Sequence, residues 1–263
     1  MLVRPDLRFS GQLSPFYSGF RGLIRSLVDT VYPSCCAVCR RPIGHGFCCA
    51  PCLAEIEESR TVPACPRCAA DVAPYQLRDG RCPQCRRRRP HLKSIVRVGS
   101  YRGSLAEVLI QFKYGRKERL SRVLGDWLSD SIAATSWFTR VEGVLFVPSR
   151  WRRRLMRGHY PAEELARRVG RAMDLPLLPI LRRVRGGPSQ IGLSYAQRVR
   201  NVRGAFALTK GTNLQEARLL LIDDVMTTGA TLNECAKVLR RGGAAEVYAA
   251  VALVAHGRWR PLP

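Results

Sequence analysis

The sequence is poor in acidic residues and holds no long apolar run, and these absences exclude classes of protein. No uninterrupted apolar stretch approaches the length of about 20 residues that a membrane-spanning helix needs. The amino end, MLVRPDLRFSGQLSPFYSGF, lacks an apolar core followed by a small-residue cleavage site, so it does not predict a signal peptide. We therefore expect a cytoplasmic protein without a membrane span. Hydrophobic residues make up 46% of the 263 residues, which excludes a disordered chain and allows one fair-sized core plus a smaller module.

Acidic residues are outnumbered by basic ones, with 20 Asp and Glu against 44 Lys and Arg, for a net charge of +24. A surface of this kind attracts polyanions with a steep dependence on salt. A GC-rich genome, which enriches arginine codons everywhere, is the alternative explanation. The arginines are clustered, however, which favours a binding surface; we take Arg152, Arg153 and Arg154 as candidate nucleic-acid-binding residues.

Cysteine is almost absent from the carboxyl two thirds of the chain, since ten of the eleven cysteines fall between Cys35 and Cys85. They form four C-x-x-C motifs, a spacing that suits tetrahedral Zn²⁺. A disulfide framework is the rival, but a cytoplasmic chain keeps such thiols reduced. Closed four-thiolate sites predict a structural role for the zinc. Sequential and interleaved pairing both stay open, and Cys35 or Cys48 could substitute for a neighbour; the expected ligands are Cys36, Cys39, Cys49, Cys52, Cys65, Cys68, Cys82 and Cys85.

The chain divides by pattern into three parts. Residues 1–34 form a tail in which apolar residues from Phe20 to Val31 recur at the spacing of an amphipathic helix. Residues 35–89 hold the cysteine motifs and end in the basic run Arg86–Arg89. In residues 90–263 strands alternate with helices, which predicts an α/β domain with a doubly wound parallel sheet. The expected strands are 95–101, 144–147, 219–222 and 247–254, and the expected helices are 105–112, 120–132, 162–173 and 232–241.

The segment Leu219–Leu232 has the sequence LLLIDDVMTTGATL and joins an apolar run, two carboxylates and a hydroxyl-rich loop. The apolar run predicts a parallel strand covered on both faces. Asp223 and Asp224 then fall at its carboxyl end, where open α/β sheets bind ligands. The loop and the start of the next helix offer hydroxyls and backbone N–H groups to a phosphate; these residues are Thr227, Thr228, Gly229, Ala230 and Thr231. An Asp pair that merely caps a turn is the structural alternative.

This segment resembles the ribosyl-phosphate signature of type I phosphoribosyltransferases. The resemblance implies that Asp223 and Asp224 hold the ribose hydroxyls of phosphoribosyl pyrophosphate, and that Thr227–Thr231 holds its 5-phosphate. It also implies the fold, a type I phosphoribosyltransferase-like doubly wound parallel sheet behind a small N-terminal zinc module with four-cysteine sites.

The order of the other motifs is similar to that of the ComF/GntX family, some members of which are associated with DNA uptake. The cysteine motifs are followed by FKYGRK, VPSRWRRRLMRG, SQIGLSYAQRVRNVRGAF and LIDDVMTTGAT. By this resemblance Pro148, Ser149, Arg150 and Arg157 face pyrophosphate, with Mg²⁺ bridging its oxygens. The stretch Arg185–Arg203 would close over the substrate, and its Arg198 joins Asp223 and Asp224 as a catalytic candidate.

Two positions depart from the family pattern. Phe146 stands where a second proline is usual, and Tyr160 and Pro161 replace an amide pair. Without the two amide side chains, we expect turnover and the choice of acceptor to differ from the family pattern, whereas ligand binding by Asp223 and Asp224 is unaffected.

Three functions are compatible with these residues. The first is binding of phosphoribosyl pyrophosphate with Mg²⁺, with possible transfer of the ribosyl phosphate to an acceptor that the sequence does not identify. The second is handling of single-stranded DNA during transformation by the same fold without catalysis. A regulator that senses phosphoribosyl pyrophosphate is a third, and the sequence is silent on oligomeric state.

Overall fold

The computed structural model describes residues 34–87, 90–115, 118–149, 160–185 and 195–255. The chain divides into two compact units, Met1–Cys49 and Ala50–Pro263. The expected amphipathic helix from Phe20 to Val31 lies outside the described residues. Within the part of the chain that the structure describes, no helix has both the length and the apolar character to cross a membrane.

The described part of the first unit is a tight turn built around the first C-x-x-C motif. Cys35 and Pro42 form an antiparallel bridge, and the N–H of Cys36 donates to the carbonyl of Arg41 at 2.8 Å. Arg40 closes the turn with a φ of 64°. This turn holds Cys36 and Cys39 close together on the backbone.

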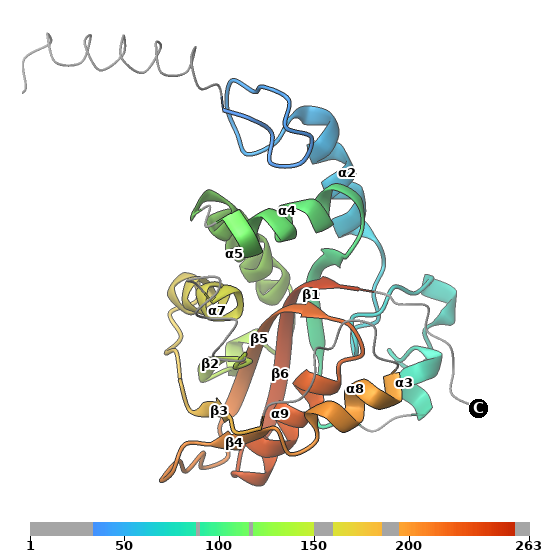
Figure 1. Ribbon diagram of the computed structural model, residues 1–263. Coiled ribbons are helices and arrows are strands. Elements are labelled where there is room, and N and C mark those ends of the chain that lie inside the picture. Colours follow the sequence, from blue (N-terminus) through green and yellow to red (C-terminus); the bar gives the residue numbers. More distant parts are fainter. Residues whose placement is uncertain (1–33, 88–89, 116–117, 150–159, 186–194, 256–263) are drawn as a thin grey trace, which may run out of the picture. The chain divides into compact units, whose positions relative to one another are not determined.

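The second unit is organised on a four-stranded parallel sheet (Figure 1). Its order is β1-β6-β5-β2, so the strand that carries the two carboxylates is central and flanked by β6 and β2. The strands are β1 (Ile95–Ser100), β2 (Gly143–Phe146), β5 (Arg218–Met226) and β6 (Glu246–Val254). The predicted α/β architecture with a parallel sheet is therefore confirmed.

Helices cover both faces of this sheet, as the apolar runs of β5 and β6 require. The helices α4 (Gly103–Gly115), α5 (Glu118–Ala133) and α7 (Pro161–Ala172) lie on one face, and α9 (Ala230–Arg241) lies on the other (Figure 1). In α5 the buried leucines recur every four residues, at Leu120, Leu124 and Leu128, which gives the helix one apolar stripe. Trp137 stacks on Tyr248 of β6, with the ring centroids 4.3 Å apart. A short 3-10 turn, η2 (Phe138–Arg140), leads into β2.

A small antiparallel pair follows α7. It consists of β3 (Leu181–Arg183) and β4 (Phe206–Leu208), which pair at Leu181 with Leu208. Between them lies α8 (Tyr195–Val202), a helix that the sequence pattern did not predict within the expected lid Arg185–Arg203. Residues 186–194 of that stretch lie outside the described residues.

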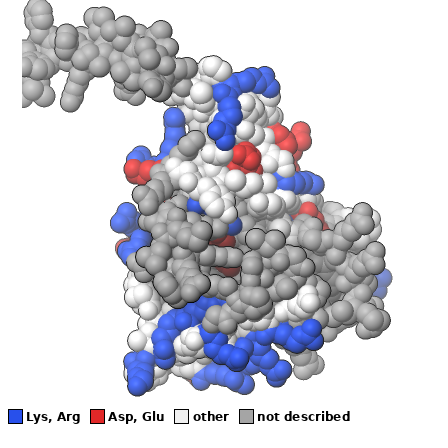
Figure 2. Space-filling model, viewed as in Figure 1, with Lys and Arg blue, Asp and Glu red and all other residues white. Residues whose placement is uncertain are grey.

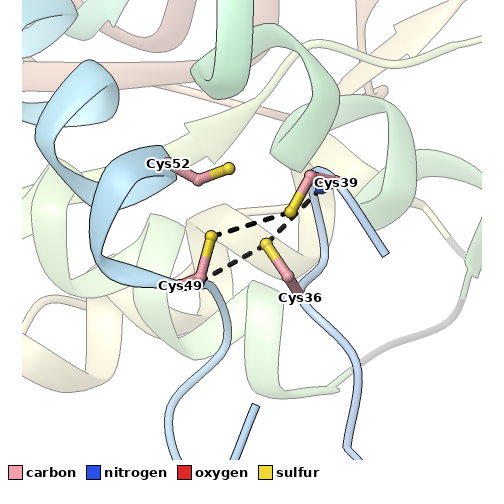
Figure 3. A group of neighbouring side chains, drawn as sticks. All are labelled: Cys36, Cys39, Cys49 and Cys52. Carbon is pink, nitrogen blue, oxygen red and sulfur yellow. Dashed lines mark hydrogen bonds between the residues drawn. The ribbon is translucent and has the colours of Figure 1, made fainter. Parts of the chain in front are cut away.

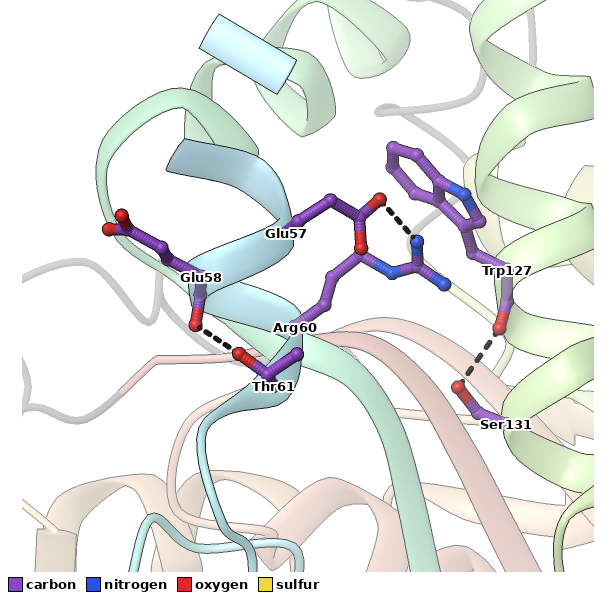
Figure 4. A network of polar contacts seen from close by, with 6 residues as sticks. All are labelled: Glu57, Glu58, Arg60, Thr61, Trp127 and Ser131. Carbon is purple, nitrogen blue, oxygen red and sulfur yellow. Dashed lines mark hydrogen bonds and ion pairs between the residues drawn. The ribbon is translucent and has the colours of Figure 1, made fainter. Parts of the chain in front are cut away.

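The amino end of the second unit packs on the α4/α5 side of the sheet through α2 (Ala50–Thr61). The guanidinium of Arg60 lies over the ring of Trp127 on α5, 4.4 Å from its centroid, and donates a hydrogen bond to Glu57 at 2.7 Å (Figure 4). Trp127 is thus half-buried under an arginine, which gives it a packing role. The chain then forms η1 (Pro74–Gln76) and α3 (Pro83–Arg87) around the second pair of C-x-x-C motifs.

Candidate functional site

The two carboxylates of the candidate site lie inside β5, shortly before its end, whereas the sequence placed them after the strand. β5 stays paired with β6 beyond them, from Asp223 opposite Val251 to Met226 opposite Val254. Successive side chains of a strand point to opposite faces. Asp223 therefore lies on the α9 face, together with Leu219 and Leu221 of the core cluster, and Asp224 lies on the opposite face.

Asp224 meets a cation on its own face of the sheet. The ammonium of Lys113, in the last turn of α4, lies 2.9 Å from the Asp224 carboxylate, and the two side chains are 17% and 20% exposed. This mostly buried ion pair fixes the direction of the Asp224 carboxylate. Lys113 was not among the predicted site residues, because only the packing of α4 on the sheet brings it to β5.

Asp223 is held differently. Its carboxylate accepts a hydrogen bond from the N–H of Asp224 at 2.8 Å. Desolvation by burial, followed by the charge of Asp224, raises the pKa of Asp223 well above its usual range. The neighbouring Cys235 on α9 is fully buried, and burial raises the pKa of its thiol well above the ordinary value, as expected for a packing residue.

The hydroxyl-rich loop joins β5 to α9 without any intervening element. Gly229 has a φ of 70°, a left-handed conformation that favours glycine, and it begins α9 as the N-cap residue. The N–H of Ala230 is directed to the Thr228 hydroxyl at 3.3 Å. The segment Thr227–Thr231 thus lies at the start of a helix of 12 residues, where N–H groups and the helix dipole favour an anion.

The residues predicted to face pyrophosphate are described only in part. Pro148 and Ser149 follow β2, whose neighbour is β5; the N–H of Val147 donates to the carbonyl of Ile222 at 2.9 Å. Pro148 and Ser149 therefore lie beside the strand that carries the carboxylates. Arg150, Arg157 and Arg152–Arg154 lie outside the described residues, as does the side chain of Arg198 in α8.

The two departures from the family pattern are neighbours in space. The rings of Phe146 and Tyr160 meet edge to face, with centroids 5.6 Å apart and an interplanar angle of 70°. One large ring thus packs against the other, so the two replacements form a single aromatic contact between the end of β2 and the start of α7.

The first group of cysteines that could hold a metal ion consists of Cys36, Cys39, Cys49 and Cys52 (Figure 3). Their sulfur atoms all lie within 4.8 Å of one another, and those of Cys39 and Cys49 are 3.6 Å apart. Tetrahedral zinc with Zn–S bonds of about 2.3 Å places its sulfurs about 3.8 Å apart. Burial opposes ionisation of Cys36, but N–H groups of Cys39, Cys49 and Val38 donate to its sulfur and lower its pKa to about 6.

The second group consists of Cys65, Cys68, Cys82 and Cys85 and lies wholly in the second unit. Its sulfur pairs Cys65–Cys85 and Cys68–Cys82 are 3.9 and 3.7 Å apart, again the separations of a tetrahedral four-sulfur site. Both groups join consecutive C-x-x-C motifs, so the structure selects sequential over interleaved pairing. Cys35 and Cys48 belong to neither group.

The second cysteine group is anchored to the sheet by a buried arginine. The side chain of Arg97 on β1 is 4% exposed, pairs with Asp71, and donates to the carbonyl of Ala69 at 2.8 Å. The carboxylate of Asp71 also accepts a hydrogen bond from the Ser100 hydroxyl at 2.7 Å. Burial lowers the pKa of Arg97, and Asp71 opposes that shift. Sequence reasoning missed this contact, because Arg97 looks like a surface residue in an alternating strand.

Comparisons with known proteins agree with the sequence motifs of this site. The profile of the phosphoribosyl transferase domain family matches residues 155–262. Competence protein F of Haemophilus influenzae is 30% identical over 204 residues, which cover 76% of this chain and 86% of that protein. The DNA utilization protein YhgH of Salmonella typhimurium is 30% identical over 224 residues, or 82% of this chain and 94% of that protein. Among solved structures, the glutamine phosphoribosylpyrophosphate amidotransferase from B. subtilis aligns with 54% of this chain and 30% of its own chain. The sequence identity is 20% and the TM-score is 0.37.

Proposed function

The chain belongs to the ComF family of phosphoribosyltransferase-like proteins, and on that premise we propose that it binds phosphoribosyl pyrophosphate together with Mg²⁺. The observation that carries the proposal is the continuous segment from Asp223 to Thr231. It joins a pair of carboxylates within a central parallel strand to a loop at the start of a helix. Carboxylate oxygens suit a ribose diol or Mg²⁺, and the helix start suits a phosphate.

In this proposal each residue has one task. Asp223 and Asp224 orient the ribose hydroxyls, with Asp224 held by Lys113 at 2.9 Å, and Thr227–Thr231 takes the 5-phosphate. Pro148, Ser149, Arg150 and Arg157 face the pyrophosphate, where arginines bind oxygens in pairs. Mg²⁺, when bound, neutralises charge on the departing pyrophosphate. Arg198 in the lid would complete the set, and ribosyl transfer to an acceptor is the reaction that such a ligand supports.

Titration calorimetry with phosphoribosyl pyrophosphate and Mg²⁺ tests the proposal. We expect saturable binding by wild type and its loss in Asp224→Ala. Asp126→Ala is the matched control, because Asp126 is an exposed carboxylate on α5, outside this segment. Equal affinity in wild type and Asp224→Ala would refute the assignment.

We also propose that each cysteine group holds one structural zinc ion. Four sulfurs at the separations of a tetrahedral site leave no position for a substrate. Thiolate ligands of this kind favour the reducing cytoplasm as the place of action.

Single-stranded DNA is the second candidate ligand, and two observations favour it. Relatives carry the names competence protein and DNA utilization protein. In addition, exposed basic residues gather on and beside β3, β4, α8 and α9, and Figure 2 shows this basic area; the residues are Arg182, Arg185, Arg200, Arg203, Lys210, Arg240 and Arg241. Charge reversal at Arg152, Arg153 and Arg154 should lower DNA affinity and flatten its salt slope. DNA affinity that hardly responds to salt would refute this candidate.

A further inference from the structure

A cavity of about 510 Å³ opens in the second unit beside the loop proposed to bind the 5-phosphate. We call it the phosphate-side cavity. Five stretches of chain line it: Thr227–Ala230 with the first two turns of α9, α8, residues 90–95, Val254 of β6, and the second cysteine group with its flanking residues. Figure 1 shows α8, α9 and α3 around this region. The volume lies in the range of about 300–1,000 Å³ that is usual for small-molecule sites.

The cavity adjoins only one end of the proposed ribosyl-phosphate site. Thr227, Thr228 and Gly229 line it, whereas Asp223 and Asp224 do not. Asp224 faces Lys113 on the opposite side of the sheet from α9. The space is therefore next to the phosphate and away from the ribose hydroxyls, which neighbour the carbon that an acceptor attacks.

This position argues against an acceptor site. An acceptor joins the ribose at C1, on the far side of the sugar from the 5-phosphate. The phosphate of phosphoribosyl pyrophosphate at this end is terminal and needs no further space. A ligand whose 5-phosphate continues into another group, as in a phosphodiester, would place that group here.

The lining has the chemistry of a nucleoside site. Its apolar part includes four buried side chains, Leu92, Ile95, Met226 and Val254. Its polar part includes Gln84 and Asn233, whose amide NH₂ groups can donate to a base edge, and the carboxylate of Glu234. Three cations, Arg67, Arg203 and Lys237, also line it and suit a phosphodiester.

Hydrogen bonds between distant segments hold the walls in place. The N–H of His91 donates to the side-chain carbonyl of Asn233 at 2.7 Å, and the N–H of Gly204 donates to Glu234 at 2.9 Å. Arg67 donates to the carbonyl of Lys93 at 2.8 Å. The cysteine group, the segment before β1, the turn after α8 and α9 are thus tied around one space, which is the mark of a preformed site.

We propose that the phosphate-side cavity binds the nucleoside on the 5′ side of a phosphodiester whose phosphate lies on the loop Thr227–Thr231. The ligand class is a short single-stranded oligonucleotide, with a dinucleotide as its smallest member. This inference rests on the proposed function, since it takes the loop as the phosphate site. It adds a subsite for the preceding nucleotide and gives the second cysteine group a place in its wall.

The test compares thymidine 5′-(methyl phosphate) with the dinucleotide dTpdT by titration calorimetry on the full chain. Both are singly charged phosphodiesters, and only dTpdT carries the additional nucleoside. Wild type should bind dTpdT about tenfold more tightly, because the additional nucleoside buries apolar surface in the cavity. Val199→Trp, at a 38% exposed position of α8 that lines the cavity, should abolish this gain and leave the affinity for thymidine 5′-(methyl phosphate) unchanged. Val184→Trp, at a 44% exposed position that does not line it, is the matched control and should keep the gain.

The outcomes separate this inference from the proposed function. Equal affinity of wild type for both probes, or a gain that survives in Val199→Trp, would overturn the cavity's role while phosphoribosyl pyrophosphate binding still stands. If thymidine 5′-(methyl phosphate), dTpdT and phosphoribosyl pyrophosphate all fail to bind, the phosphate loop itself is refuted, and the inference falls with it.

Discussion

Replacing Asp71 by Ala should destabilise the second unit strongly, because it leaves Arg97 charged and buried. The Arg97 side chain is 4% exposed and Asp71 is its ion-pair partner. Removing one partner of a buried pair costs about 3–5 kcal/mol. The carbonyls of Ala69 and Val62, which accept from Arg97 at 2.8 and 3.3 Å, remain and solvate part of the charge. We therefore expect the lower end, a loss of about 3 kcal/mol in the free energy of unfolding.

Urea denaturation with zinc present throughout measures this loss. With a slope of about 3 kcal/mol per molar urea, the midpoint should fall by about 1 M. Asp126→Ala, which removes an exposed carboxylate on α5, should stay within about 0.5 kcal/mol of wild type. The double variant Asp71→Leu with Arg97→Met removes both charges and should recover most of the loss. A midpoint for Asp71→Ala equal to that of Asp126→Ala would show that the pair does not anchor the cysteine group.

Three further predictions concern protons and metal. The pKa of Asp223 is raised in the protein without ligand, and a bound diol or Mg²⁺ favours the ionised carboxylate. Ligand affinity should therefore rise with pH above the usual carboxyl range, by up to about tenfold per pH unit. Calorimetry on Asp223→Asn should show no such dependence. Because the pKa of Asp223 is higher in the folded chain than in the unfolded one, the free energy of unfolding falls as pH rises between these two pKa values. Asp223→Asn should therefore unfold at a higher temperature than wild type near neutral pH. An unfolding temperature below that of wild type would contradict the account. Elemental analysis should find two zinc ions per wild-type chain and one in Cys82→Ser. Cys35→Ser is the control and should keep two, because Cys35 belongs to neither group. Equal zinc content in wild type and Cys82→Ser would refute the second site.

Local pattern was sufficient for the sheet and its main helices. Apolar runs such as Leu219–Ile222 and Val247–Val254 mark strands covered on both faces, and the four-residue spacing in α5 marks an amphipathic helix. The carboxylates were placed beyond the strand because aspartate disfavours β structure. Pairing with β6 overrides that preference and extends β5 to Met226.

Contacts between distant segments were not predictable in this way. Lys113 lies in the family motif FKYGRK, but the sequence assigns it no partner, and only the packing of α4 brings it to Asp224. The pairing of the cysteine motifs had two solutions by spacing, and the fold selects the sequential one. The short strands β3 and β4, of 3 residues each, give too little pattern to be recognised.

A crystal structure of the full chain with phosphoribosyl pyrophosphate and Mg²⁺ tests the central claim most directly. The account predicts that the 5-phosphate accepts hydrogen bonds from N–H groups of Thr227–Thr231 and that the ribose hydroxyls lie against Asp224, with the Lys113 contact of 2.9 Å retained or exchanged for the ligand. A ligand bound elsewhere on a folded, zinc-loaded chain, with this segment empty, would contradict it.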